Sequence, residues 1–270
     1  MNGTLPIIFL TKDRTGCACA CADAMLSRLS VSGYTLRHIV CDDGSTPGHL
    51  EAVLGVYRRH GVEPSVHVST RERHGLGAIM NMGLEDAFLD PSVDKCLRME
   101  DDWLLKRPLD IGPLVGQMDS LKIGSLRLGM MFREESELPP FNKCLLRVRS
   151  LKKQTFTYNN QIAVVTRGMY EMLGRYPENA APPVVEKHAA NKYNKITDYG
   201  HNPPYVAWPA GWKTKTYYDE KLPFAHIGAS ISGHDKLYRI PLKYMGYNDQ
   251  KLSERLRSDA LSATTASTTA

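Results

Sequence analysis

The sequence contains no apolar run that approaches the roughly 20 residues needed to span a bilayer. It also lacks the basic start and cleavable apolar core of a secretory leader, because residues 5–10 form only a strand-length apolar run. We therefore expect no membrane span and a cytoplasmic protein. Internal repeats are not visible either, which argues against a repeat architecture.

Cysteines with the spacing of a zinc site are also lacking. The thiols within residues 17–21 lie two apart, whereas zinc ligands usually follow Cys-x-x-Cys spacing. A cytosolic chain of this length does not need disulfides, so we expect small buried thiols in a loop or first helical turn. Cys41, Cys96 and Cys144 lie in apolar strand-like runs and are predicted to be core residues.

What is present is an ordinary globular composition. The chain has 270 residues, of which 42% are hydrophobic and 23% charged, so it is neither disordered nor fibrous. Strand-like apolar runs occupy residues 5–11, 36–41, 65–69 and 96–99. Helical spacing of apolar residues lies between them, at 22–29, 50–57 and 76–89. This alternation predicts an α/β fold with a mostly parallel central sheet flanked by helices.

The second half is organised differently. Strand-like runs at 126–132, 144–149 and 162–166 mix with proline-rich loops, which indicates an elaborated continuation of the first sheet. We expect residues 1–120 and 121–257 to be two halves of one domain. The Ala/Ser/Thr-rich tail at 258–270 is predicted to be disordered.

Charge divides between the same two halves. Residues 1–120 carry 12 basic and 16 acidic side chains, whereas residues 121–270 carry 22 and 13. The second half includes a basic cluster with no acid among its members, formed by Lys143, Arg147, Arg149, Lys152 and Lys153. Such a cluster fits either a polyanion-binding surface or a solvated strand face that protects a sheet edge.

Carboxylates follow two of the predicted strands. Asp42 and Asp43 come after one strand and Glu100, Asp101 and Asp102 after another, so both groups fall where ligands bind in parallel sheets. Adjacent carboxylates repel unless a cation offsets them, and a hard divalent ion with a diphosphate provides that compensation. We favour this interpretation over a solvated acidic turn. The Asp42 turn fits either a helix cap or hydrogen bonds to a base or ribose.

Four short motifs in order, at residues 6–14, 40–45, 75–83 and 98–103, make the first 110 residues or so resemble family-2 nucleotide-sugar glycosyltransferases. The resemblance implies the GT-A fold, a Rossmann-like α/β arrangement with an acceptor-side half. The chain departs from the family pattern at Glu100, where an aspartate is usual.

The resemblance also implies site roles. Thr11 and Arg14 would line the nucleotide pocket, and Asp42 or Asp43 would hold the base. Arg73 would approach the base or diphosphate, and Asp101 the ribose. The metal, Mn²⁺ or Mg²⁺, would be held by Glu100, Asp102 and the late histidine His226, with His234 as a second possibility. A core role for His226 is the alternative.

An inverting transfer needs a general base near the acceptor hydroxyl. The family places it at a helix start, and the nearest match here is Glu186. Lys187 stands where the family often has aspartate, so Asp198 and Asp219 remain rivals. A first-turn carboxylate that merely favours the helix is the alternative interpretation of Glu186.

These implications define the expected activity: transfer of a sugar from a nucleoside-diphosphate donor, a UDP-sugar by preference, to a hydroxyl. The acceptor is either a glycan or a hydroxymethylated base of DNA, as in viral DNA modification. In the viral case the compartment is the host cytoplasm, and a duplex would require base flipping. The alternatives are nucleotidyl transfer and a degenerate nucleotide- or nucleic-acid-binding module.

Overall fold

A computed structural model describes most of the chain. The described residues are 3–129, 140–148, 161–198, 204–212 and 222–227. The predicted tail at 258–270 lies outside them. Among the helices described, none has the length and apolar character that crossing a bilayer requires.

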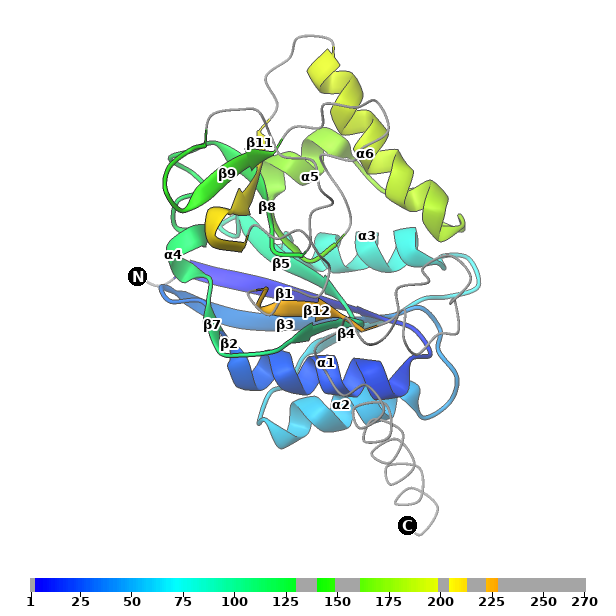
Figure 1. The fold of residues 1–270 in the computed structure, drawn as a ribbon. Coiled ribbons are helices and arrows are strands. Elements are labelled where there is room, and N and C mark those ends of the chain that lie inside the picture. Colours follow the sequence, from blue (N-terminus) through cyan, green and yellow to red (C-terminus); the bar gives the residue numbers. More distant parts are fainter. Residues whose placement is uncertain (1–2, 130–139, 149–160, 199–203, 213–221, 228–270) are drawn as a thin grey trace, which may run out of the picture.

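The first hundred residues alternate between strand and helix, as predicted (Figure 1). The elements are β1 (Gly3–Thr11), α1 (Thr15–Arg28), β2 (Leu29–Ser30), β3 (Tyr34–Asp42), α2 (His49–Arg59), β4 (Ser65–Val68), α3 (Leu76–Ala87) and β5 (Lys95–Glu100). Strands β1, β3 and β5 extend beyond the predicted bounds, because pairing continues at the start of β1 and at both ends of β3 and β5, whereas β4 ends one residue before its predicted end.

The remaining elements are shorter, apart from one long helix. They are β6 (Trp103–Leu105), β7 (Leu109–Asp110), α4 (Gly112–Val115), β8 (Ile123–Arg127), β9 (Leu145–Val148), β10 (Ala163–Thr166), α5 (Arg167–Leu173), α6 (Pro182–Asp198), β11 (Tyr205–Pro209), η1 (Ala210–Trp212) and β12 (Phe224–His226). Helix α6 begins earlier than expected, because the two prolines that open it are compatible with a first helical turn.

Eight strands form one sheet in the order β4-β3-β1-β5-β10-β8-β11-β9. Strands β4, β3, β1 and β5 are mutually parallel. Strand β10 runs antiparallel to both β5 and β8, and β11 is parallel to β8. Consequently β1, β3, β5, β8 and β11 all end at the same edge of the sheet.

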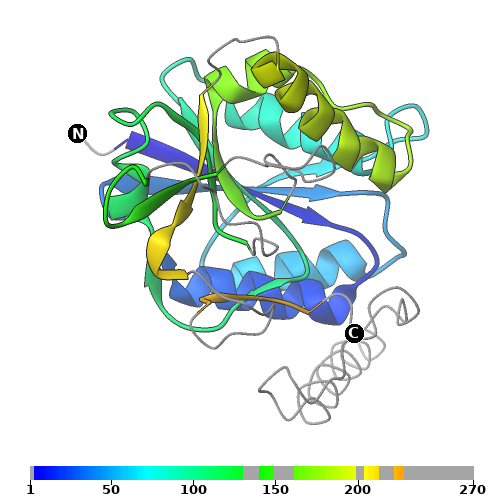
Figure 2. The same ribbon diagram turned by 45° about the horizontal axis from the view of Figure 1, so that its top comes forward.

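Helices cover both faces of this sheet. Helices α1 and α2 lie on one face, and α3, α5 and α6 lie on the other (Figures 1 and 2). The prediction of a mostly parallel central sheet flanked by helices is confirmed, and β8 to β11 extend that same sheet.

Small side chains bring the helices close to the sheet. In α1, Cys17 and Cys21 are buried, as expected of small thiols in the Cys-Ala repeat. The predicted core thiols Cys41 and Cys96 are also buried. The same prediction is wrong for Cys144, which is exposed, because it lies just before β9 and the inward position there is taken by the buried Leu145.

Two glycines fix the position of α3. A Cβ atom at Gly83 would lie 2.5 Å from Cγ2 of Ile8 and 3.0 Å from Sγ of Cys41. At Gly77 it would lie 2.0 Å from the carbonyl oxygen of Pro177. Helix α3 therefore packs tightly both on the sheet and on the segment that leads into α6.

Candidate functional site

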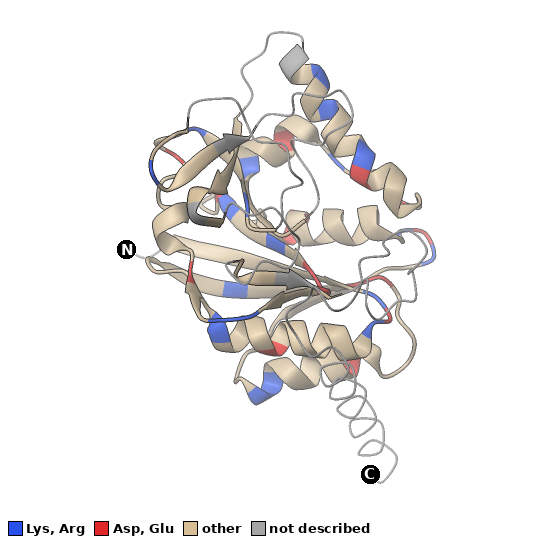
Figure 3. Ribbon diagram, viewed as in Figure 1, with Lys and Arg blue, Asp and Glu red and all other residues tan. Residues whose placement is uncertain are grey.

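Four aspartates gather at the edge where the parallel strands end. They are Asp42, Asp43, Asp101 and Asp102, and we call them the strand-end carboxylates. Since β1 lies between β3 and β5, its last residue, Thr11, lies between the two pairs. Figure 3 shows acidic segments (red) with basic ones beside them at this end of the sheet. The predicted convergence of residues from separate strands is therefore present.

Asp101 is fully buried and hydrogen-bonded through both oxygens. Its Oδ2 accepts from the Thr11 hydroxyl at 2.9 Å and from the Lys12 backbone N–H at 3.1 Å. Its Oδ1 accepts from the guanidinium of Arg14. Burial raises the pKa of Asp101 to about 6, although Arg14 and these hydrogen bonds oppose the shift. The carboxyl is thus a fixed part of the site, not a solvated turn.

Arg14 bridges the two adjacent aspartates. Its Nη2 pairs with Asp101 and its Nη1 with Asp102, and Asp102 is only 4% exposed. Burial of the guanidinium opposes its charge, but the carboxylates of Asp102 and Asp101 outweigh that effect and raise the pKa of Arg14. The charge on Arg14 is therefore permanent. We call this pair of contacts the Arg14 bridge.

Asp42 closes a local turn. Its Oδ2 accepts from the backbone N–H of Ser45 at 3.0 Å, and its Oδ1 accepts from the Ser45 hydroxyl. The helix-cap interpretation is wrong for Asp42, because α2 begins at His49 and its N-cap residue is Gly48. The turn instead holds the Asp42 carboxylate near the end of β1.

Asp43 connects two loops to each other. Its Oδ2 pairs with Nζ of Lys12 at 2.7 Å, and its Oδ1 accepts from the backbone N–H of Gly75 at 2.6 Å. Gly75 has a φ of 83°, a conformation that favours glycine, and it directly precedes α3. Asp43 therefore ties the loop before α3 to the loop after β1.

His49 is a site residue that the sequence analysis did not identify. Its Nε2 lies 2.7 Å from Oγ1 of Thr11 and 3.9 Å from Oδ1 of Asp42, and its Nδ1 lies 2.9 Å from Oγ1 of Thr15. The Thr11 hydroxyl donates its one proton to Asp101, so it must accept from His49 Nε2–H. Burial lowers the pKa of His49, which favours the neutral imidazole. In that form Nε2 carries the proton and Nδ1 can accept from the Thr15 hydroxyl. No local pattern distinguishes such a histidine from any other helix-start residue.

Arg73 is bound to carboxylates away from the strand-end carboxylates. Its Nε and Nη2 lie 2.9 and 2.7 Å from the carboxylate oxygens of Glu178, and Glu85 lies at 3.5 Å. The hydrogen bond from Arg73 lowers the pKa of Glu178 to about 2. Arg175 also pairs with Glu178 at 2.7 Å. Arg73 is near the Gly75 loop in sequence, but its predicted contact with a base or diphosphate stays a prediction.

The candidate base, Glu186, lies in the second turn of α6 and is exposed. It is therefore not a first-turn carboxylate. Partial desolvation raises the pKa of Glu186, with Lys187 opposing the shift. The segment before α6 is joined to the loop before α3, because the Asn179 backbone N–H donates to the His74 carbonyl at 2.9 Å. The role of Glu186 stays a prediction.

The roles of the two rival bases, Asp198 and Asp219, also stay predictions. Asp198 ends α6, and a helical rise of about 1.5 Å per residue puts it roughly 18 Å along the axis from Glu186. Asp219 lies outside the described residues.

The late histidine lies on a strand beside the metal candidate. Strand β12 pairs with β6 so that His226 is opposite Trp103, the residue after Asp102. The backbone N–H of Ile227 also donates to the carbonyl of Asp102 at 2.8 Å. This register brings the backbone of His226 next to that of the candidate ligand. The His226 side chain and all of His234 lie outside the described residues.

The predicted basic cluster is mostly outside the described residues. Lys143 is exposed just before β9, and Arg147 is in β9 opposite Ala207 of β11. The Arg147 side chain is not described, and neither are Arg149, Lys152 and Lys153.

The donor chemistry at Asp102 and Glu100 fits a divalent cation. Carboxylate oxygens are the ligands that Mg²⁺ and Mn²⁺ take, usually together with phosphate oxygens and water. Among the side chains that the structure describes, no three of His, Cys, Asp or Glu are grouped as metal ligands. Of the two candidate carboxylates among the described side chains, Asp102 is already paired with Arg14.

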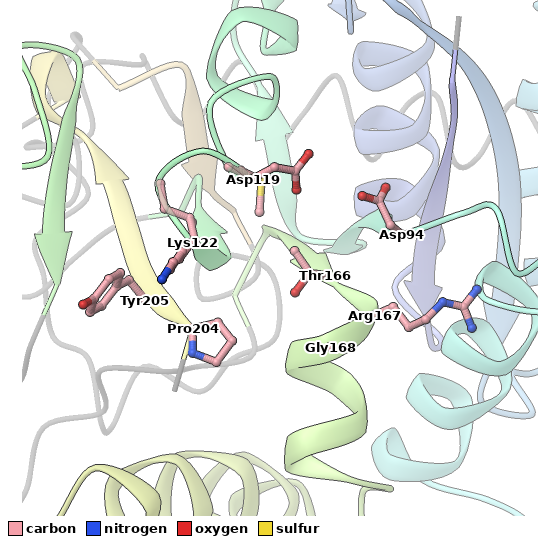
Figure 4. Close-up of a pocket in the computed structure, with 10 residues that line it drawn as sticks. Asp94, Asp119, Lys122, Thr166, Arg167, Gly168, Pro204 and Tyr205 are labelled. Atoms are coloured by element: carbon pink, nitrogen blue, oxygen red, sulfur yellow. The ribbon is translucent and has the colours of Figure 1, made fainter. Parts of the chain in front are cut away.

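A hollow of about 630 Å³ lies at the opposite edge of the sheet (Figure 4). Asp94 precedes β5, Ile123 and Tyr205 begin β8 and β11, and Thr166 ends the antiparallel β10. Ligands of such sheets bind at the carboxyl ends of parallel strands, so this hollow is at the wrong end for the expected chemistry. We assign it no role in that chemistry.

Solved structures share this arrangement of sheet and helices, which is the GT-A fold. Staphylococcus aureus TarS 1–349 in complex with UDP-GlcNAc aligns with a TM-score of 0.53 at 14% identity, covering 76% of this chain and 58% of TarS 1–349. The same protein in complex with UDP aligns with a TM-score of 0.50 at 15% identity, over 76% and 60% of the two chains. The predicted fold is thereby confirmed.

A mannosyltransferase from Pyrobaculum calidifontis, in complex with GDP-Man and Mn²⁺, aligns less well. Its TM-score is 0.49 at 17% identity, over 81% of this chain and 59% of that one. This chain thus spans less than two thirds of the length of the proteins it matches. Neither a protein-family model nor a curated protein sequence matches the chain.

Proposed function

We propose that the protein is a glycosyltransferase that uses a nucleoside-diphosphate sugar, a UDP-sugar by preference, and transfers the sugar to an acceptor hydroxyl with inversion. The observation that carries this proposal is the gathering of four buried aspartates at the carboxyl edge of a GT-A sheet. The solved structures with this fold that bind UDP and UDP-GlcNAc support the choice of donor.

The nucleotide end of the donor would lie over the end of β1. Asp42 and Asp43 would accept hydrogen bonds from the base, and Asp101 would orient the ribose. The Thr11 hydroxyl is hydrogen-bonded to both Asp101 and His49, and Nε2 of His49 lies 3.9 Å from Oδ1 of Asp42. Because these residues are already paired in the free protein, they need little reorganisation when the donor binds.

The diphosphate would lie toward Asp102. There the side chains of Asp102, Glu100 and His226 would hold Mn²⁺ or Mg²⁺, which as a Lewis acid neutralises the departing nucleoside diphosphate. Arg14 places a positive charge beside Asp102. The acceptor hydroxyl would lose its proton to Glu186, the candidate general base of the transfer.

The acceptor divides the proposal into two branches. One is a glycan hydroxyl, and the other is the hydroxymethyl group of a modified base in DNA. The excess of positive charge beyond residue 120 supports a polyanionic acceptor for this chain.

The test is donor hydrolysis and binding across UDP-, GDP-, ADP- and TDP-sugars in the presence of Mn²⁺. We expect one donor class to be hydrolysed by the wild-type protein and by Asp23→Asn, a matched change of an exposed aspartate in α1. Asp102→Asn should lose hydrolysis. Acceptor trials then compare glycans with hydroxymethylated DNA.

Other outcomes would identify the alternatives. Release of pyrophosphate from a nucleoside triphosphate and a sugar phosphate would indicate nucleotidyl transfer. If the wild-type protein and Asp102→Ala bind acceptor equally and neither shows turnover, the chain is a binding module and the proposal is wrong.

A further inference from the structure

We propose that Arg14 is the residue that sets the cation requirement of the site: its guanidinium and a divalent cation are alternative partners for Asp102, and the cation binds well only when Arg14 leaves. This inference rests on the proposed function. It concerns the chain's own residues in the absence of donor.

The first step in the argument is the burial of charge. Asp101 and Asp102 are 0% and 4% exposed, and they are adjacent in sequence. Two buried carboxylates repel each other and lose hydration, so a positive charge beside them is needed in the folded state. The Arg14 bridge supplies that charge before any metal or donor is present.

The second step concerns which carboxylate is available. Asp101 also accepts from the Thr11 hydroxyl and the Lys12 backbone N–H, so it is held independently of Arg14. For Asp102, Oδ2 is the atom that Arg14 contacts. A cation that takes this oxygen must therefore displace the Nη1 end of the guanidinium, while the Asp101 end can stay in place.

The third step is the reach of Arg14. It lies just before α1, in the loop after β1, and its side chain is 33% exposed. A diphosphate entering beside Asp102 would offer the guanidinium a second anionic partner, since arginine binds phosphate oxygens well. Donor and cation binding would then be mutually reinforcing, because each favours the same displaced position of Arg14.

The test is direct measurement of Mn²⁺ binding by calorimetry or by the EPR signal of free Mn²⁺. Arg14→Gln should bind Mn²⁺ more tightly than wild type by about 10-fold or more, the scale on which partners of metal ligands change metal affinity. Arg14→Lys keeps the charge but cannot span both carboxylates, so its affinity should lie between the two.

Lys12→Gln is the matched control. It removes the same charge from the same loop, but Lys12 pairs through its side chain with Asp43 and not with Asp102. If Arg14→Gln acted only by removing one positive charge from this edge of the sheet, both glutamine variants would gain the same Mn²⁺ affinity. Equal gains, or no gain in Arg14→Gln, would overturn the inference.

Thermal unfolding provides a second readout that does not depend on turnover. Without metal, Arg14→Gln leaves two buried carboxylates without their bridge, so its Tm should fall. Saturating Mn²⁺ should raise its Tm by more than it raises that of wild type, because binding to the native state stabilises it. A smaller rise than in wild type would contradict the inference.

Measurements of UDP binding distinguish failure of the Arg14 inference from failure of the proposed function. If wild type binds UDP with Mn²⁺ but Arg14→Gln shows no gain in metal affinity, the inference fails and the proposed function stands. If no nucleotide binds to any of these proteins, the proposed function fails. Adding UDP should also narrow the difference in Mn²⁺ affinity between wild type and Arg14→Gln, because the diphosphate draws Arg14 away in the wild type.

Discussion

At the residue scale, the site is a set of short polar contacts between segments that are distant in sequence. Thr11, His49 and Asp42 join the ends of β1 and β3, and Thr11 joins β1 to the residue after β5. The Thr11 hydroxyl forms buried hydrogen bonds with His49 and Asp101, so single substitutions here should affect stability as well as donor binding.

His49→Leu should destabilise the protein by about 1–3 kcal/mol, because the hydroxyls of Thr11 and Thr15 lose a buried partner. Chemical denaturation measures this loss. His60→Leu is the control, since His60 pairs with an exposed Asp23 and a surface pair contributes about 0–1 kcal/mol. Equal losses of unfolding free energy in the two variants would show that the buried contacts of His49 contribute no more than a surface pair.

We predict that Glu178 contributes to the pH dependence of folding stability in acid. Its pKa is lowered to about 2 by the hydrogen bond from Arg73, so the ionised form is favoured in the folded state. A lowered pKa contributes stability that is present above the unfolded value of about 4.3 and is lost as the pH falls toward 2.

The test compares denaturation of wild type and Glu178→Gln between pH 2 and pH 6. Wild type should lose roughly 2 kcal/mol more than the variant over this range, after allowance for solvent screening at a partly exposed group. Parallel pH profiles for the two proteins would contradict the assignment.

The sequence predicted the strand-end carboxylates but not the contacts between them. Asp42, Asp43, Asp101 and Asp102 follow apolar runs, and parallel strands must end together, so their convergence could be inferred. The Arg14 bridge and the hydrogen bonds of His49 depend on loop conformations that bring together residues 34 to 88 positions apart. No periodicity encodes such a contact, and the same is true of Arg73 and Glu178.

At the element scale, helix α3 connects the strand-end carboxylates to the segment before α6. Its glycines allow a close approach on both sides, against Ile8 of the sheet and against Pro177. Its N-terminal loop is held by Asp43. The helix itself was predicted from apolar spacing, but the reason for its glycines became clear only from the packing.

Gly77→Ala should therefore destabilise the protein, by about 1–3 kcal/mol for an overpacked position. The added Cβ would lie 2.0 Å from the Pro177 carbonyl oxygen, so α3 or the segment before α6 must move. Donor KM should rise as well, because Asp43 is tied to the loop before α3.

Gly55→Ala in α2 is the control for that experiment. Its nearest neighbour atom would be Nη2 of Arg58 at 3.7 Å, so the new methyl group has room. Here the higher helix propensity of alanine should stabilise the protein by about 0.5–1 kcal/mol. Stabilisation of both variants would show that Gly77 is not tightly packed.

At the scale of the whole molecule, negative and positive charge are divided between the two halves of the chain. The first half provides the strand-end carboxylates, and the second half carries the basic excess. If DNA is the acceptor, this excess contributes binding that weakens as the salt concentration rises, because the release of counterions from DNA then becomes less favourable.

Lys152→Ala with Lys153→Ala should then lower the slope of log affinity against log salt by about 2, since each phosphate contact contributes about 0.9. Arg58→Ala with Arg59→Ala removes the same charge from the end of α2 in the other half and should leave the slope nearly unchanged. An unaltered slope in the lysine variant would remove the support for a DNA acceptor.

The reversed direction of β10 has a consequence for how such proteins diversify. Because β10 runs back between β5 and β8, the chain leaves β8 and β11 at the same rim as the strands that carry the aspartates. Insertions and replacements after β8 or β11 can therefore reshape what faces the donor without altering the strands that hold it. Under the proposed function, evolution could exchange the recipient of the sugar while the source of the sugar stays the same.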